Sequence, residues 1–96
     1  MSADQRLTED EERLVRIFRA LGNPTRLGIV KLLKQRNACI CGEIVGSTPL
    51  AQSTVSQHLK VLKEAGIVMG EVEGPAICYC LNQETITWLK QKVGEL

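Results

Sequence analysis

The sequence predicts a mainly helical α+β fold in a single domain. Apolar residues recur at helical spacing in four long segments, which is typical of amphipathic helices. Residues 67–72 and 76–81 are short and apolar, and Glu73-Gly74-Pro75 separates them, which indicates a hairpin. Ninety-six residues suit one domain. We place this domain at residues 1–96, with a mobile tail at residues 1–7.

Capping residues locate the first two helices. Thr8 and Glu11 fit a capping box, so the first helix should begin at Thr8. Asn23 is a good N-cap and Pro24 a good first residue for the second helix, which we expect to end near Lys34. The apolar positions are Leu14, Ile17, Phe18 and Leu21 in the first helix and Leu27, Ile29, Val30, Leu32 and Leu33 in the second.

The middle of the chain combines a short strand with two further helices. Residues 38–41 should be extended, residues 42–45 should form a short helix, and residues 46–49 should form a turn. The next helix is expected at residues 52–64, followed by Gly66 as its C-cap. The apolar side of that helix carries Val55, Leu59 and Leu62.

The last helix should follow the hairpin, with Asn82 as its N-cap. The predicted order is helix, helix, strand, helix, helix, strand, strand, helix. Two helices joined by a short turn and followed by a hairpin form a winged helix-turn-helix. The prediction is therefore five helices and a small antiparallel sheet, made of a two-stranded wing and a short strand before the helix-turn-helix.

Composition excludes several classes of protein. The chain has no apolar run long enough to span a membrane and no apolar signal-peptide core, so we expect a cytoplasmic protein with no membrane partner. Three aromatic residues are too few for base stacking on single strands. Thiols stay reduced in the cytoplasm, so the four cysteines are interpreted as ligands, sensors or core residues rather than a disulfide framework.

The helix at residues 52–64 has a polar side suited to the major groove of DNA. Gln, Ser and Thr can contact base edges there, and Lys can neutralise phosphate. The same side could instead be an ordinary solvated surface. Seven basic and no acidic residues between Arg13 and Arg36 favour DNA, although some of these arginines could pair across a subunit interface. The candidate DNA-binding residues are Gln52, Ser53, Thr54, Ser56, Gln57 and Lys60.

Two stretches resemble the ArsR/SmtB family of bacterial winged-helix repressors. Leu21-Gly-Asn-Pro-Thr-Arg-Leu-Gly-Ile-Val is similar to the start of the family's second helix. Gln52-Ser-Thr-Val-Ser-Gln-His-Leu-Lys-Val-Leu-Lys-Glu-Ala-Gly-Ile-Val is similar to its recognition helix and wing start. The resemblance implies a homodimer that binds double-stranded operator DNA of inverted-repeat type and is released by a ligand or an oxidant. It also implies a dimer interface on the first and last helices, here Val15, Phe18, Ile86, Leu89 and Val93.

The last helix and the wing depart from the family pattern. His58 corresponds to a frequent family histidine, but it is the only histidine in the chain, so the last helix lacks the His/Asp set with which some relatives bind zinc between subunits. We expect His58 to pack and form hydrogen bonds rather than bind metal. Glu71 and Glu73 replace the basic residues often found at the wing tip, which makes contact between wing and DNA doubtful.

Two Cys-x-Cys pairs, Cys39/Cys41 and Cys78/Cys80, form the candidate sensor. Cys39-Ile40-Cys41 resembles the Cys-x-Cys that family sensors of arsenic, cadmium or lead commonly place ahead of the helix-turn-helix. Alternation along a strand places Ile77, Tyr79 and Leu81 on one side and both cysteines of the second pair on the other. Because the short strand should pair with the last wing strand, all four sulfurs could gather on one side of the sheet within one subunit.

Such a cluster permits three chemistries. Thiolates could bind As(III) or Sb(III), which we rank first, and Cd²⁺ or Zn²⁺ would also suit four sulfurs. A redox switch through disulfide or persulfide formation ranks second. The alternative to a sensor is that the cysteines are small buried hydrophobic residues of the core. A thiol oxidoreductase would need Cys-x-x-Cys, so we expect no enzyme. The other alternative function is a winged helix that binds protein and not DNA. Such a protein would have weak affinity for DNA even at low salt.

Overall fold

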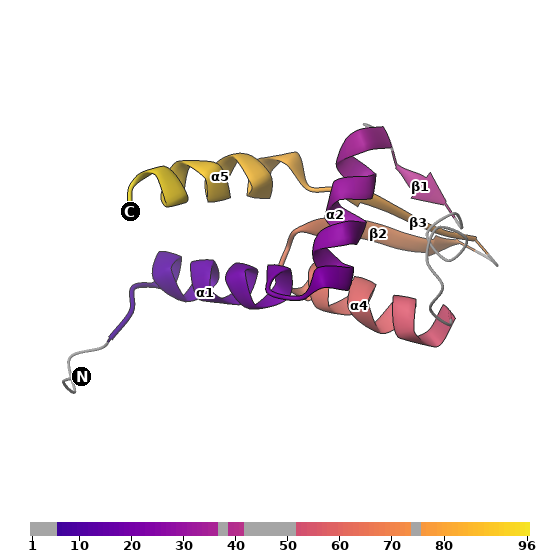
Figure 1. Ribbon diagram of the computed structural model, residues 1–96, viewed down its shortest axis with the longest axis horizontal. Coiled ribbons are helices and arrows are strands. Elements are labelled where there is room, and N and C mark those ends of the chain that lie inside the picture. Colours follow the sequence, from indigo (N-terminus) through magenta and orange to yellow (C-terminus); the bar gives the residue numbers. More distant parts are fainter. Residues whose placement is uncertain (1–5, 37–38, 42–51, 74–75) are drawn as a thin grey trace.

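The computed structural model describes residues 6–36, 39–41, 52–73 and 76–96. Within these ranges the chain forms four helices and a three-stranded antiparallel sheet (Figure 1). The elements are α1 (Glu9–Leu21), α2 (Pro24–Arg36), β1 (Ile40–Cys41), α4 (Gln52–Glu64), β2 (Val68–Glu73), β3 (Ala76–Leu81) and α5 (Gln83–Gly94). The short helix predicted at 42–45 and the turn at 46–49 lie outside the described residues, as do residues 1–5 of the predicted tail. No helix in the described ranges is long and apolar enough to cross a membrane.

The predicted caps hold the helix starts in place. Thr8 Oγ1 accepts from the backbone N–H of Glu11, and Glu11 Oε1 accepts from the backbone N–H of Thr8, which confirms the capping box. Asn23 Oδ1 accepts from the N–H groups of Thr25 and Arg26 at 2.9 and 3.1 Å, so it caps α2. The predicted end of α2 at Lys34 was two residues short, since α2 continues to Arg36.

The predicted caps also locate the C-terminus of α4 and the N-terminus of α5. Gly66 has a φ of 79°, the left-handed conformation that terminates α4, and its N–H donates to the carbonyl of Lys63. Asn82 Oδ1 accepts from the N–H of Thr85, which confirms the N-cap of α5. These local signals set where the recognition helix candidate stops and where the last helix leaves the sheet.

The core lies between α1, α2, α4 and the inner side of the sheet. Apolar side chains from these elements exclude water, and burying a large aliphatic side chain contributes about 1.5–3 kcal/mol. The buried members are Ile17, Ala20, Ile29, Leu33, Val55, Leu59, Leu62, Ile67, Val68 and Leu81. Leu27 was predicted to share the apolar side of α2, but it is 46% exposed. Leu27 lies six residues before Leu33, so it points about 120° away from it around the helix.

The sheet has the order β1-β3-β2, so β3 is the central strand. Both pairings are antiparallel, with Ile40 opposite Tyr79 and Cys41 opposite Cys78 on one edge. On the other edge, Gly70 lies opposite Tyr79 and Met69 opposite Cys80. The predicted short strand therefore does pair with the last wing strand, which confirms that part of the fold.

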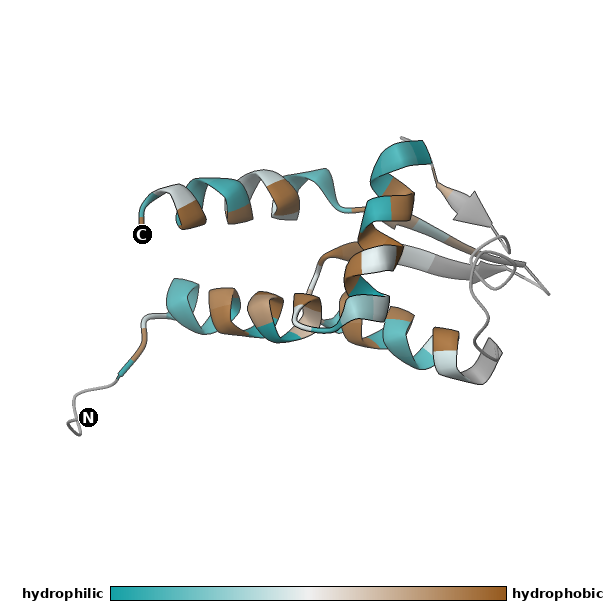
Figure 2. Cartoon of the chain, in the orientation of Figure 1, coloured by the Kyte–Doolittle hydropathy of each residue, from teal (hydrophilic) through white to brown (hydrophobic). Residues whose placement is uncertain are grey.

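The helices α1 and α5 extend away from the sheet end of the molecule (Figure 1). Their projection makes the chain elongated, with extents of 48 × 24 × 23 Å. Both helices carry hydrophobic bands along this extension (Figure 2). The two ends of the molecule therefore differ in kind, because one is a sheet and the other a pair of helices with apolar surface.

Candidate DNA-binding surface and cysteine cluster

Helix α4 has one buried side and one solvent-exposed side. Val55, Leu59 and Leu62 are buried in the core. Among the predicted DNA-binding residues, Thr54, Gln57 and Lys60 are exposed and Ser56 is half-buried, while the side chains of Gln52 and Ser53 lie outside what the structure describes. The exposed members provide a hydroxyl, an amide and a cation, the groups that read base edges and neutralise phosphate.

Arg26 connects α4 to the end of α1. Its Nε donates to the carbonyl of Ala20 at 2.6 Å and its Nη2 to the carbonyl of Arg19 at 3.2 Å, so it satisfies carbonyls at the C-terminus of α1. Its Nη1 lies 3.4 Å from Nδ1 of the half-buried His58. A guanidinium can only donate, so Nδ1 of His58 accepts. The prediction that His58 packs and forms a hydrogen bond is confirmed.

Arg13 connects α1 to α5. Its guanidinium carbon lies 4.2 Å from the centre of the Trp88 ring, and its Nη2 donates to Oγ1 of the buried Thr85 at 3.3 Å. Lys92 of α5 lies 3.4 Å from the carboxylate of Asp10. Within the described residues, the contacts that join these two helices include a cation–π pair, a hydrogen bond and a partly exposed ion pair.

The predicted interface residues on α1 and α5 are only partly covered within one chain. Phe18 is 44% exposed and Val93 is 45% exposed. Val15, Ile86 and Leu89 are half-buried, and the last two pack against the core. Phe18 and Val93 thus leave apolar side chains exposed on α1 and α5, the helices on which the dimer interface was predicted.

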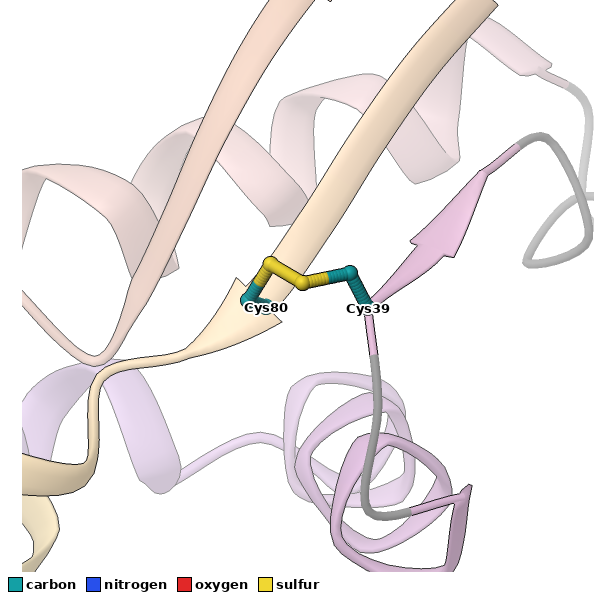
Figure 3. The surroundings of a disulfide bond; sticks show 2 residues. All are labelled: Cys39 and Cys80. Carbon is teal, nitrogen blue, oxygen red and sulfur yellow. A yellow bond between two sulfur atoms is a disulfide. The ribbon is translucent and has the colours of Figure 1, made fainter.

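The sheet brings together one cysteine from each Cys-x-Cys pair. Cys39, just before β1, and Cys80 of β3 form a disulfide, with Cα atoms 4.3 Å apart (Figure 3). Cys78 is disulfide-bonded as well. Its Cα partner across the sheet is Cys41, whose side chain is outside the described part. The expected gathering of the two pairs is therefore confirmed for Cys39 and Cys80.

The oxidation state of these cysteines was predicted wrongly. We expected reduced thiols rather than disulfides, and the structure instead contains a bond between strands. The alternation of side chains along a strand explains this bond, because cysteines that face each other on one side of a sheet have their sulfurs within bonding range. Within the described residues no group of three or more His, Cys, Asp or Glu side chains is arranged to hold a metal ion. Thiolate binding of an ion therefore requires reduction first.

Three contacts of the site had no signal in the sequence. They are Arg26 with His58, Arg13 with Trp88, and Lys63 Nζ, which donates to the carbonyl of Gly70 at 3.0 Å and ties α4 to the wing. Each joins segments that only the tertiary fold brings together. The glutamates predicted to weaken wing–DNA contact, Glu71 and Glu73, lie in β2, and their side chains are not described.

Comparison with known proteins places the chain in a family. Residues 23–69 match the model described as "Bacterial regulatory protein, arsR family". An uncharacterized HTH-type transcriptional regulator of Methanocaldococcus jannaschii is 38% identical over 89 residues, which cover 92% of this chain and 99% of that protein. The chain belongs to the ArsR family. As an ArsR-family member it is related to transcriptional regulators, which are not enzymes.

Two further ArsR-family comparisons bear on function. The arsenical resistance operon repressor of Escherichia coli K12 is 29% identical over 82 residues, covering 84% of this chain and 69% of that protein. The solved homodimeric winged helix-turn-helix DNA-binding domain of Mycobacterium bovis superposes with a TM-score of 0.73 at 28% identity. That superposition covers 98% of this chain and 86% of the other.

Proposed function

We propose that this ArsR-family chain is a homodimeric repressor that binds an inverted-repeat operator in duplex DNA and loses affinity when its cysteines react. The observation that carries the proposal is the exposed row of Thr54, Gln57 and Lys60 on α4, opposite a buried apolar stripe. The core fixes this helix while its polar side stays free for a groove. Gln52, Ser53 and Ser56 complete the proposed contact surface.

Substitutions on α4 test the DNA-binding half. Gln57→Ala should cost about 1–3 kcal/mol on the best operator and relax base preference, because an amide that reads a base edge carries specificity. Lys60→Ala should weaken all sequences alike and lower the salt dependence. Fluorescence anisotropy on a duplex selected from random sequence measures both. Gln35→Ala, an exposed glutamine on α2, is the matched control. Wild-type binding by both α4 variants would contradict the assignment.

The homodimer is supported by the exposed apolar residues of α1 and α5. Phe18 and Val93 are among the exposed large hydrophobic residues of the described chain. With Val15, Ile86 and Leu89 they form the proposed interface. The M. bovis relative is described as homodimeric, which favours the same arrangement here.

Thiophilic ions are the first candidate for the inducer. Once reduced, Cys39 and Cys80 would present adjacent thiolates, with Cys78 two residues along β3 on the same side and Cys41 opposite it in register. Soft thiolates suit As(III), Sb(III) and Cd²⁺, and four of them would also suit Zn²⁺. The arsenical resistance relative favours As(III) within this set.

A redox signal is the second candidate, and the Cys39–Cys80 disulfide favours it. Two thiols and one peroxide give one disulfide and two waters, so the sulfurs lose two electrons that the peroxide gains. Either signal acts on β1, from which the chain continues through residues 42–51 to α4. A change in the sheet could thereby re-aim the recognition helix, and coupling between such sites is usually about 1–3 kcal/mol.

One titration separates the two candidates. Protein reduced and freed of reductant is bound to the selected duplex, then given arsenite, Cd²⁺ or peroxide. Release by arsenite and not by peroxide supports the ion sensor, and the reverse supports the redox sensor. Cys39→Ser or Cys41→Ser should bind DNA but resist release. If Cys78→Ser and Cys80→Ser respond as wild type does, the second pair has no part in sensing.

A further inference from the structure

The two sulfurs of the Cys39–Cys80 disulfide have different surroundings. Cys39 is exposed and lies at the outer edge of the sheet, just before the edge strand β1 (Figure 3). Cys80 is half-buried in β3, which has a neighbouring strand on each side. Thiol–disulfide exchange depends on which sulfur a thiolate can reach, so this difference bears directly on how the bond is opened.

The direction of attack sharpens that difference. A thiolate attacks one sulfur along the S–S axis, from the side opposite the sulfur that leaves. For Cys39 that approach comes from beyond the sheet edge. For Cys80 it comes from the side of β2, where Met69 is the directly paired residue. Directly paired residues in antiparallel strands share a face, so the Met69 side chain, 51% exposed, lies beside this path.

We infer that Cys39 is the site at which a low-molecular-weight thiol enters the cluster, a step that rests on the redox candidate for function. The external thiolate bonds to Cys39 Sγ while the S–S bond breaks, and the electron pair leaves with Cys80 as a thiolate. A second external thiolate attacks the external sulfur of this mixed disulfide and releases Cys39 as a thiolate. The products are two protein thiols and one external disulfide, so the protein gains the two electrons that the external thiols lose.

Trapping the first intermediate tests the inference. Oxidised protein is mixed briefly with glutathione, quenched with acid, and alkylated with N-ethylmaleimide before peptide mass spectrometry. Glutathione should be on Cys39 and maleimide on Cys80 in at least tenfold excess over the reverse. The Cys41→Ser/Cys78→Ser double variant should give the same ratio, because it retains only the bond in question. Equal or reversed labelling, or no mixed disulfide at any glutathione concentration, would overturn the inference.

Truncating Met69, which lies beside the path of attack on Cys80, provides the matched comparison. Met69→Ala should raise the share of glutathione on Cys80 several-fold, whereas Val61→Ala, an exposed apolar residue on α4, should leave the ratio unchanged. An unchanged ratio in Met69→Ala would overturn the role of Met69 and with it the geometric argument. None of these readouts involves DNA, so the inference can fail while redox control of repression stands. Redox control fails separately if oxidation leaves DNA affinity unchanged.

Discussion

The sheet end and the helical end of this molecule are held together by different means. At the sheet end, a covalent bond joins Cys39 to Cys80 across two strands. At the helical end, Arg13 over Trp88 and the Lys92–Asp10 ion pair connect α1 to α5, while Phe18 and Val93 stay exposed. The sheet end is therefore cross-linked within one chain, and we propose that this cross-link responds to thiol chemistry. The helical end leaves apolar surface exposed, and we propose that a second copy of the chain covers it.

Loss of the disulfide should have the largest effect on stability. The bond joins residues 41 positions apart, and in the chain-entropy account closing such a loop contributes about 3–4 kcal/mol. In the Cys41→Ser/Cys78→Ser background, where the Cys39–Cys80 bond alone closes this loop, adding Cys39→Ser should lower the free energy of unfolding by about that amount in urea denaturation under oxidising conditions. With reductant present, the double and triple variants should agree within about 0.5 kcal/mol. A difference that persists in reductant would show that the bond is not its source.

Gly70→Ala should damage the sheet end without touching a cysteine. A Cβ at Gly70 would lie 2.4 Å from the Tyr79 ring, so the ring or the strand must move. Such overpacking costs about 1–3 kcal/mol. Thermal unfolding measures it, and Gly28→Ala on α2, where a Cβ meets nothing within 4 Å, is the control. Gly28→Ala should be neutral or stabilising. Equal stability of the two variants would mean that Tyr79 does not pack over Gly70.

Truncating the exposed apolar residues at the helical end should weaken the dimer. Phe18→Ala and Val93→Ala should each raise the dimer dissociation constant roughly 5- to 30-fold, equivalent to about 1–2 kcal/mol of buried apolar surface. Sedimentation equilibrium at micromolar concentration measures this. Leu27→Ala, which removes an equally exposed leucine on α2, should leave the constant unchanged. A wild-type protein that sediments only as monomer would refute the interface.

Arg13→Ala should have the smallest effect of the four. It removes the cation–π contact with Trp88 and the hydrogen bond to Thr85, together worth about 1 kcal/mol. Urea denaturation at fixed protein concentration should show that loss. Arg16→Ala, an exposed arginine one turn away, should stay within about 0.5 kcal/mol of wild type. Similar losses in both variants would mean that general charge matters rather than the Trp88 contact.

Most of the fold could be predicted because its signals are local. The caps at Thr8, Asn23 and Asn82 and the positive φ of Gly66 follow from residue types at fixed offsets. Strand alternation also placed Cys39 and Cys80 on one side of the sheet. The boundaries that moved, such as the end of α2, are positions where no breaker residue follows at once.

The rest of the site depends on information that a sequence does not contain. Oxidation state depends on chemistry as well as position, so the prediction of free thiols at Cys39 and Cys80 was wrong although their placement was right. Arg13 meets Thr85 across 72 residues of chain, and no local pattern encodes that distance. The exposure of Leu27 depends on which arc of α2 the other helices cover.

We propose that the oxidation and ligand state of the cysteine cluster sets the affinity of the protein for DNA. The most direct test is the dissociation constant for one selected operator duplex, measured by anisotropy with reduced, arsenite-treated and peroxide-oxidised protein of verified cysteine state. The reduced dimer should bind tightly, and arsenite or peroxide should lower its affinity about 5- to 150-fold. The Cys39→Ser variant should bind with the same dissociation constant in all three conditions. The same constant for wild type in every state would contradict this proposal.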